Sequence, residues 1–285
     1  SFLLDVKKEN IFCFFIVFSA DAKTKKVGLV LSGGGALGFA HIGAIQALEE
    51  SGIHPNVIAG SSMGALVGVL YADGLTPIEM LQIIKDEKLY KKSKILKVKA
   101  STNPKLGWYS HVATRNVLTK LIPQNSFDSL SKDFYVCVTN LGDAKWEIKS
   151  EGNQVIEYVI ASAAIPGVFE AEIINGKTYI DGGTLNNLPA QAIRDKCDVL
   201  IGVDVLPLTY QKASKTVDVL FQALRASQHQ NSLEGRKLCD HLIESYAIHK
   251  YNEFDFEEYL EIYKYGYSAM KTYIEKHPEL LKQCK

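Results

Sequence analysis

The sequence lacks several features that would assign it to a particular class of protein. Lysine plus arginine and aspartate plus glutamate number 32 each in 285 residues, so no overall positive charge favours nucleic-acid binding. The five cysteines form no CxxC pair and have no histidine-rich neighbours, which argues against a metal site. No internal repeat or low-complexity segment occurs. What remains is an ordinary globular composition, 47% hydrophobic and 22% charged.

The N-terminal region has the parts of a secretory signal peptide. Lys7 and Lys8 precede the apolar run 11–20, and residues 20–22 read Ala-Asp-Ala, a small-residue cleavage pattern. The run is too short to cross a bilayer, which takes roughly 20 residues. We expect residues 1–22 to be a signal peptide or an N-terminal arm, and residues 23–285 to form one domain. Export to a periplasmic or membrane-associated location is favoured over a cytoplasmic one.

A strand, a glycine-rich loop and a helix follow one another at 27–50. Val27–Leu31 is a short apolar run typical of a buried parallel strand. Residues 32–38 contain four glycines, and apolar residues at helical spacing follow until Gly52, a predicted C-cap. This arrangement points backbone N–H groups at an anion from a helix N-terminus.

The rest of the chain alternates short apolar strands with helices. Strands are predicted at 54–59, 134–139, 145–149, 169–174, 177–180, 198–205 and 242–247. Helices are predicted after the second strand, from the capping box at Thr76, and at 112–122, 155–164, 188–196 and 217 onward. The alternation predicts a single α/β domain, a three-layer α/β/α fold with a mostly parallel central sheet. The tyrosine-rich stretch 254–274 is expected to pack into the core.

A lysine-rich stretch occurs at 85–99, with seven lysines against two acids. The favoured interpretation is a solvated helix end with a connecting strand. The alternative is a basic surface that makes peripheral contact with anionic lipid.

Gly60-x-Ser62-x-Gly64 lies at a strand-to-helix turn and matches a nucleophile elbow. Glycine is required at both flanks because side chains there would collide, and the turn exposes the Ser62 hydroxyl at the carboxyl end of the sheet. Gly33-x-Gly35-x-x-Gly38 also fits a dinucleotide fingerprint, but that motif needs an acidic residue at the end of the next strand. Ser62 occupies that region instead. The loop is therefore better interpreted as an oxyanion hole, built from Gly33, Gly34, Gly35, Ala36 and Gly38.

Ser62 needs a base, and Asp181 is the favoured one. It ends a predicted strand, and Gly182 and Gly183 allow its carboxylate to approach another backbone closely. Burial would raise its basicity, so a Ser-Asp dyad is chemically sufficient. Four histidines are less well placed for a triad: His41, His229, His241 and His249.

The motifs GGGALG, GSSMG and DGG, in this order and spacing, resemble those of the patatin-like phospholipase family, as does the segment ASAAIP at 161–166. The resemblance covers 27–205. It implies an acyl hydrolase with Ser62 as nucleophile, Asp181 as base, the glycine loop as oxyanion hole, and no metal or cofactor. The implied substrates are phospholipids, lysophospholipids and related acyl esters. One position departs from the family pattern: Leu37 stands where an arginine or lysine is usual, which bears on substrate preference.

Two alternatives to hydrolysis stay open from the sequence. The same dyad could serve an acyltransferase, in which an alcohol or thiol replaces water as acceptor. A chain with this fold could also bind lipid without catalysis. The sequence does not determine head group, acyl-chain preference or oligomeric state.

Overall fold

The computed structural model describes residues 25–98, 107–206, 214–244 and 246–285. The predicted signal peptide or arm at 1–22 lies outside the described residues, as does Lys99 at the end of the lysine-rich stretch.

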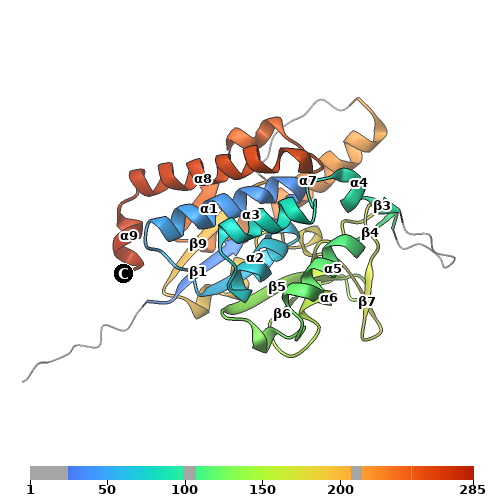
Figure 1. The fold of residues 1–285 in the computed structure, drawn as a ribbon, viewed down its shortest axis with the longest axis horizontal. Coiled ribbons are helices and arrows are strands. Elements are labelled where there is room, and N and C mark those ends of the chain that lie inside the picture. The colour runs from blue at the N-terminus through green and yellow to red at the C-terminus, as the bar shows by residue number, and fades with distance from the viewer. Residues whose placement is uncertain (1–24, 99–106, 207–213, 245) are drawn as a thin grey trace, which may run out of the picture.

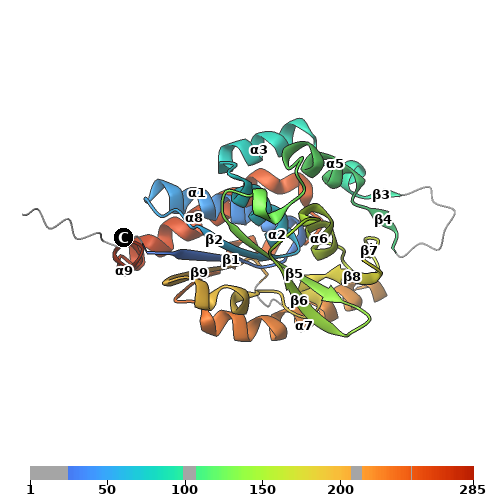
Figure 2. The ribbon, with the colours of Figure 1, turned by 90° about the horizontal axis from the view of Figure 1, so that it is seen from below.

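An eight-stranded mixed sheet lies at the centre of the domain (Figure 2). Its order is β10-β9-β1-β2-β5-β8-β7, with β6 also paired to β5. Neighbours from β10 to β5 are parallel, whereas β6, β7 and β8 join antiparallel. The strands are β1 (Val27–Leu31), β2 (Val57–Ser61), β5 (Asp133–Asn140), β6 (Lys145–Lys149), β7 (Glu172–Ile174), β8 (Lys177–Asp181), β9 (Val199–Asp204) and β10 (His241–Glu244). A separate ribbon pairs β3 (Lys97–Val98) with β4 (Tyr109–Ser110).

Helices cover both faces of this sheet, which confirms the predicted three-layer α/β class. Figure 2 shows α1, α2 and α8 above the sheet and α7 below it. The helices are α1 (Phe39–Glu50), α2 (Met63–Asp73), α3 (Pro77–Asp86), α4 (Lys92–Ile95), α5 (Val112–Leu121), α6 (Val155–Ser162), α7 (Thr216–Leu238), α8 (Tyr259–Lys276) and α9 (Glu279–Gln283). Short 3₁₀ helices are η1 (Gly35–Gly38), η2 (Phe127–Ser129), η3 (Gly182–Thr184), η4 (Ala190–Ala192), η5 (Arg194–Lys196), η6 (Tyr246–Lys250) and η7 (Phe256–Glu258).

The alternation of side chains along β1 divides the core between the two faces. Leu29 and Leu31 belong to the large cluster that includes α1, α2 and α8, whereas Val30 packs with Leu188 and Ile193 on the opposite face. All five of these side chains are fully buried. A strand buried on both faces reads as a continuous apolar run, which is why the sequence identified β1.

The C-terminal aromatic stretch packs into the core, as predicted, and the structure shows that it lies against α1. Tyr259 is buried, stacks on Tyr90 and meets Phe39 edge-on. The backbones of α1 and α8 also approach closely, because a Cβ on Gly266 would lie 1.9 Å from the carbonyl oxygen of Ala40. This stretch therefore closes the core next to the glycine loop, as Figure 1 shows for α8 along α1.

The predicted helix at 188–196 is wrong. The segment forms the two short turns η4 and η5, with Leu188, Ala190 and Ile193 buried against the sheet. The Arg194 guanidinium donates to the carbonyl oxygens of Cys197 and Leu238, which holds the second turn against the end of α7. Packing onto the sheet and the hydrogen bond to the distant Leu238 carbonyl override the local helical pattern.

In the described part of the chain, no single helix combines the length and the apolar composition needed to cross a membrane. The pair α2 and α3 passes together by length and composition but bends by 117° between them.

Candidate active site

Ser62 lies at a strained turn between β2 and α2. Its backbone has φ 53° and ψ −125°, a left-handed conformation that is costly for a residue with a side chain. Both flanking glycines are required sterically: a Cβ on Gly60 would lie 2.4 Å from the carbonyl oxygen of Gly64, and one on Gly64 would lie 2.3 Å from that of Leu31. The turn therefore has the geometry that the elbow pattern predicted, and Ser62 stands at the N-terminus of α2, where the helix dipole favours negative charge.

The structure brings Ser62 and Asp181 into direct contact across 119 residues of sequence. Ser62 Oγ donates to Asp181 Oδ2 at 2.6 Å, and the Gly183 N–H donates to Asp181 Oδ1 at 2.7 Å. The Asp181 side chain is only 1% exposed. Burial raises the pKa of Asp181 to about 7, although these two hydrogen bonds oppose the rise. The carboxylate is thus a much stronger base than an exposed aspartate.

Hydrogen bonds within the fold already occupy some of the backbone N–H groups in the glycine loop. Gly33 donates to the carbonyl of Asn187 at 3.2 Å, and Ala36 donates to that of Glu253 at 2.9 Å. Gly34 and Gly35 line the cavity beside Ser62, and their N–H groups meet no acceptor within the described parts of the chain. Gly38, at the end of η1, packs against Met63. Two of the five predicted oxyanion residues therefore keep a backbone donor next to Ser62.

Leu37 is part of the hydrophobic core. Its side chain is 3% exposed and belongs to the cluster under α1 and α8. A salt bridge lies near the loop instead: Arg225 of α7 makes a two-point ion pair with Glu253, the residue whose carbonyl binds Ala36. Leu37 thus lacks the positive charge that is usual at this position, and its side chain is buried in the core.

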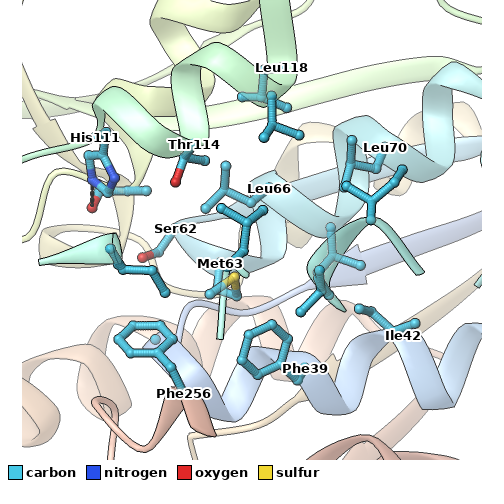
Figure 3. A pocket seen from close by; sticks show the side chains of 18 of the residues that line it. Phe39, Ile42, Ser62, Met63, Leu66, Leu70, His111, Thr114, Leu118 and Phe256 are labelled. Atoms are coloured by element: carbon cyan, nitrogen blue, oxygen red, sulfur yellow. Dashed lines mark hydrogen bonds between the residues drawn. The ribbon is translucent and has the colours of Figure 1, made fainter. Parts of the chain in front are cut away.

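A large apolar cavity begins at Ser62 and extends between α2, α3 and α5 (Figure 3). It encloses about 890 Å³ of empty space, part of it open to solvent. Figure 3 shows Ser62 at one end, with Ile42 and Leu70 farther along. Among the described residues that line it, three have polar side chains: Ser62, His111 and Thr114. An apolar lining of this kind suits a hydrocarbon chain.

Comparison with known proteins identifies the family. A family model described as patatin-like phospholipase matches residues 29–193, more than half of the chain. The chain belongs to the patatin-like phospholipase family. Ser62 and Asp181 both lie within the matched region, as does the whole glycine loop.

Relatives of this patatin-like chain include fungal proteins that are much longer. It is 28% identical over 279 residues to lysophospholipase nte1 of Aspergillus fumigatus, and the alignment covers 88% of this chain and 18% of that protein. It is 32% identical over 180 residues to lysophospholipase NTE1 of Saccharomyces cerevisiae, and the alignment covers 63% of this chain and 11% of that protein. The chain thus spans less than a fifth of the length of these curated relatives.

Similar solved structures include two with low sequence identity to this chain. VipD from Legionella pneumophila matches with a TM-score of 0.49 at 17% identity, covering 89% of this chain and 67% of that one. Human GIVD cytosolic phospholipase A2, solved in complex with a fluorophosphonate, matches with a TM-score of 0.47 at 12% identity, covering 92% and 60%.

Two residues that sequence reasoning did not single out hold the patatin-like site in place. Ser162, within the ASAAIP segment, accepts a hydrogen bond from the Ser62 N–H at 2.9 Å and donates to the carbonyl of Cys137 at 2.6 Å. Asn231 of α7 donates to the carbonyl of Gly183 at 3.0 Å and accepts from the Asn187 N–H at 2.8 Å. Ser162 thus ties the elbow to β5, and Asn231 ties the Asp181 turn to the segment that binds the glycine loop.

The histidines do not form a triad with Ser62 in the described residues. His41 is fully buried, contacts the carbonyl of Ser32 through Nε2 at 2.8 Å, and burial lowers its pKa to about 4. His241 contacts Tyr273 and Gln283. His229 lies on α7, and the His249 side chain lies outside the described part of the structure.

His111 lines the apolar cavity, and the sequence analysis did not single it out. It stacks on Phe169 with ring centroids 3.9 Å apart and contacts the carbonyl of Ala163 through Nε2 at 3.0 Å. Burial lowers the pKa of His111 to about 4, so the ring is neutral at pH 7. Within the described residues no three His, Cys, Asp or Glu side chains cluster as metal ligands would.

Proposed function

We propose that this domain is a serine acyl hydrolase of the phospholipase or lysophospholipase type, with Ser62 as nucleophile and Asp181 as base. The observation that carries the proposal is the 2.6 Å hydrogen bond from Ser62 Oγ to the buried Asp181 carboxylate at the end of an apolar cavity. Nucleophile and base within hydrogen-bond reach of one another are the signature of covalent acyl transfer.

The acylation step follows from this geometry. Ser62 Oγ attacks the ester carbonyl carbon while Asp181 takes the hydroxyl proton. The carbonyl oxygen becomes an oxyanion, which the N–H groups of Gly34 and Gly35 stabilise. Collapse of the tetrahedral intermediate breaks the bond to the leaving alcohol, and Asp181 returns the proton to the alcohol oxygen. The product is an acyl ester on Ser62, which water then hydrolyses.

The substrate class is inferred from the cavity and the relatives. The acyl chain of the substrate fits the apolar cavity, where burial of methylene groups stabilises the complex by roughly 0.8 kcal/mol each. The fungal relatives are named lysophospholipases. We therefore propose a phospholipid or lysophospholipid as substrate.

We also propose that the end of the domain beside the cavity meets a lipid surface. Trp108 is 72% exposed and lies three residues before the cavity-lining His111, and Leu220 is 65% exposed next to Phe221, which borders the site. Exposed Lys91 and Lys94 precede Ile95, another lining residue. Large apolar side chains together with lysines suit an anionic bilayer interface.

The direct test compares hydrolysis of lysophosphatidylcholine by the wild type, Ser62→Ala and Asp181→Asn. Both variants should lose about 10⁴-fold or more in kcat, as loss of a nucleophile or its base does in other serine hydrolases. Ser61→Ala is the matched control, because it removes the neighbouring buried hydroxyl, which has no hydrogen-bond partner in the described structure. Wild-type rates in both test variants would refute the dyad.

Two further measurements separate the alternatives. Labelling by a fluorophosphonate probe that vanishes in Ser62→Ala supports a reactive serine, whereas no labelling and no lipid hydrolysis would indicate a lipid-binding protein. Product analysis with added alcohol or lysolipid acceptors distinguishes free fatty acid, the product of hydrolysis, from a transferred acyl group.

A further inference from the structure

A second, smaller cavity meets the apolar one at Ser62. It encloses about 320 Å³ of empty space, part of it open to solvent, and lies between the glycine loop, the Asp181 turn and α7. Ser62, Gly35 and Ile165 border both cavities. Asp181 borders only the second one.

This division has a chemical consequence, which rests on the proposed acyl-enzyme. The acyl chain on Ser62 occupies the apolar cavity. The leaving alcohol must receive its proton from Asp181, and the water that replaces it must give a proton to Asp181. The alcohol therefore leaves, and the water enters, through the second cavity, because the Asp181 carboxylate borders that cavity and not the apolar one.

Besides Ser62 and Asp181, the described residues with polar side chains that border the second cavity are Gln228 of α7 and Glu253, which lies between η6 and η7. The Glu253 carboxylate is engaged in its two-point ion pair with Arg225, with one arm at 2.6 Å. Gln228 is different. Its side chain is only 8% exposed, and its amide makes no hydrogen bond within the described parts of the chain.

Gln228 also lies close to the proposed base. A Cβ built on Gly183 would lie 2.9 Å from Gln228 Nε2 and 3.0 Å from Asp181 Oδ1, so the amide and the carboxylate flank the same point. Neither polar atom of this amide is fully buried without a partner, so the amide is accessible from the cavity that it lines. The amide has both donor and acceptor groups, so it can hold a water molecule in the second cavity.

We propose that Gln228 binds the water that deacylates Ser62. The water oxygen attacks the carbonyl carbon of the Ser62 ester, one water proton passes to Asp181, and the Gln228 carboxamide oxygen accepts a hydrogen bond from the hydrogen that the water keeps. Collapse of the intermediate breaks the carbon–Oγ bond, and Asp181 returns its proton to Ser62 Oγ. A free fatty acid is released, and the resting hydrogen bond re-forms.

The test is Gln228→Leu, which keeps the volume and removes the amide. Gln230→Leu is the matched control, because Gln230 is an exposed glutamine on the same helix. With a p-nitrophenyl acyl ester, the variant should show a wild-type burst of nitrophenol, and its steady-state rate should fall by up to about 100-fold. Added methanol should raise the ratio of methyl ester to free acid relative to the wild type.

Two outcomes would overturn the role of Gln228. One is an unchanged steady-state rate, and the other is an equal loss of burst rate and steady-state rate, which indicates a merely structural role. If Gln228→Leu does not fold, as judged by its melting curve, Gln228→Ala is measured in the same way. Failure of the proposed function gives a different result. If the Ser62 mechanism is wrong, Ser62→Ala retains hydrolysis. If only the role of Gln228 is wrong, Ser62→Ala loses hydrolysis while the Gln228 variants behave like the wild type.

Discussion

Replacing Asp181 with asparagine should change how the stability of the domain depends on pH. The carboxylate is 1% exposed, and burial raises its pKa from 3.8 to about 7. Asparagine has nearly the same shape and carries no charge. Its Oδ1 can still accept from the Gly183 N–H, and its amide can donate to Ser62 Oγ. The substitution therefore isolates the cost of ionising a buried acid.

The magnitude follows from proton linkage. Between about pH 4 and pH 7 the folded chain keeps the Asp181 proton, whereas the unfolded chain has released it. The folded state thus binds more protons in this interval, so the contribution of this group to stability falls as pH rises, by about 1.4 kcal/mol per pH unit. Above the folded pKa of about 7 the loss levels off. From pH 5 to pH 9 the total is about 3 kcal/mol.

The assay is urea unfolding of the wild type and Asp181→Asn at pH 5 and pH 9. The free energy of unfolding of the variant, relative to the wild type, should be about 3 kcal/mol greater at pH 9 than at pH 5. Using this difference cancels the titration of groups that both proteins share. Asp128→Asn, which removes an exposed carboxylate, should keep a constant offset from the wild type. An equally constant offset for Asp181→Asn would refute the raised pKa.

The remaining predictions concern the same base, the elbow, the α1–α8 contact and the membrane face. Because the base must be ionised, kcat/KM should fall tenfold per pH unit below the pKa of about 7, as measured with a soluble ester. Ser62→Gly should be more stable to urea than Ser62→Ala by about 1 kcal/mol, since φ is 53° there. Gly266→Ala should lower the unfolding free energy by about 1–3 kcal/mol, because its Cβ would lie 1.9 Å from a carbonyl oxygen, whereas Gly142→Ala meets nothing closer than 3.6 Å. Trp108→Ala should weaken binding to anionic vesicles about tenfold and leave hydrolysis of a soluble ester unchanged, whereas Trp146→Ala should leave both unchanged. Equal vesicle binding by the two tryptophan variants would contradict the proposed membrane face.

In the proposed mechanism, stability and catalysis place opposite demands on Asp181. The ionised form that can accept the Ser62 proton is the form that burial penalises. The structure offsets part of the cost with the hydrogen bonds from Ser62 and Gly183, which lower the pKa. Such a conflict is expected for a buried group that serves as a base, as proposed for Asp181.

The amino-acid sequence by itself determined the features that depend on local sterics. The elbow needs glycine at positions 60 and 64 because neighbouring backbone lies 2.3–2.4 Å from any added Cβ, and that requirement is visible as a pattern. β1 is apolar throughout because both of its faces are buried. Ser62 and Asp181 could be identified as the candidate nucleophile and base because each lies at the end of a strand beside glycines.

Only the tertiary structure decided which partners each group meets. The N–H groups of Gly33 and Ala36 are taken by carbonyls of Asn187 and Glu253, more than 100 residues away in the sequence, which leaves Gly34 and Gly35 as donors. Such pairings depend on how distant segments pack, and no local pattern records them. The same is true of the helix predicted at 188–196, which sheet packing converts into two 3₁₀ turns.

The roles of α7 belong to this second class. Asn231 and Gln228 lie on a mostly polar helix whose sequence shows no catalytic motif, yet packing places one on the Asp181 turn and the other at the second cavity. A short motif fixes backbone geometry within a few residues. Cavities and hydrogen bonds between distant segments arise only when the whole chain has closed around them.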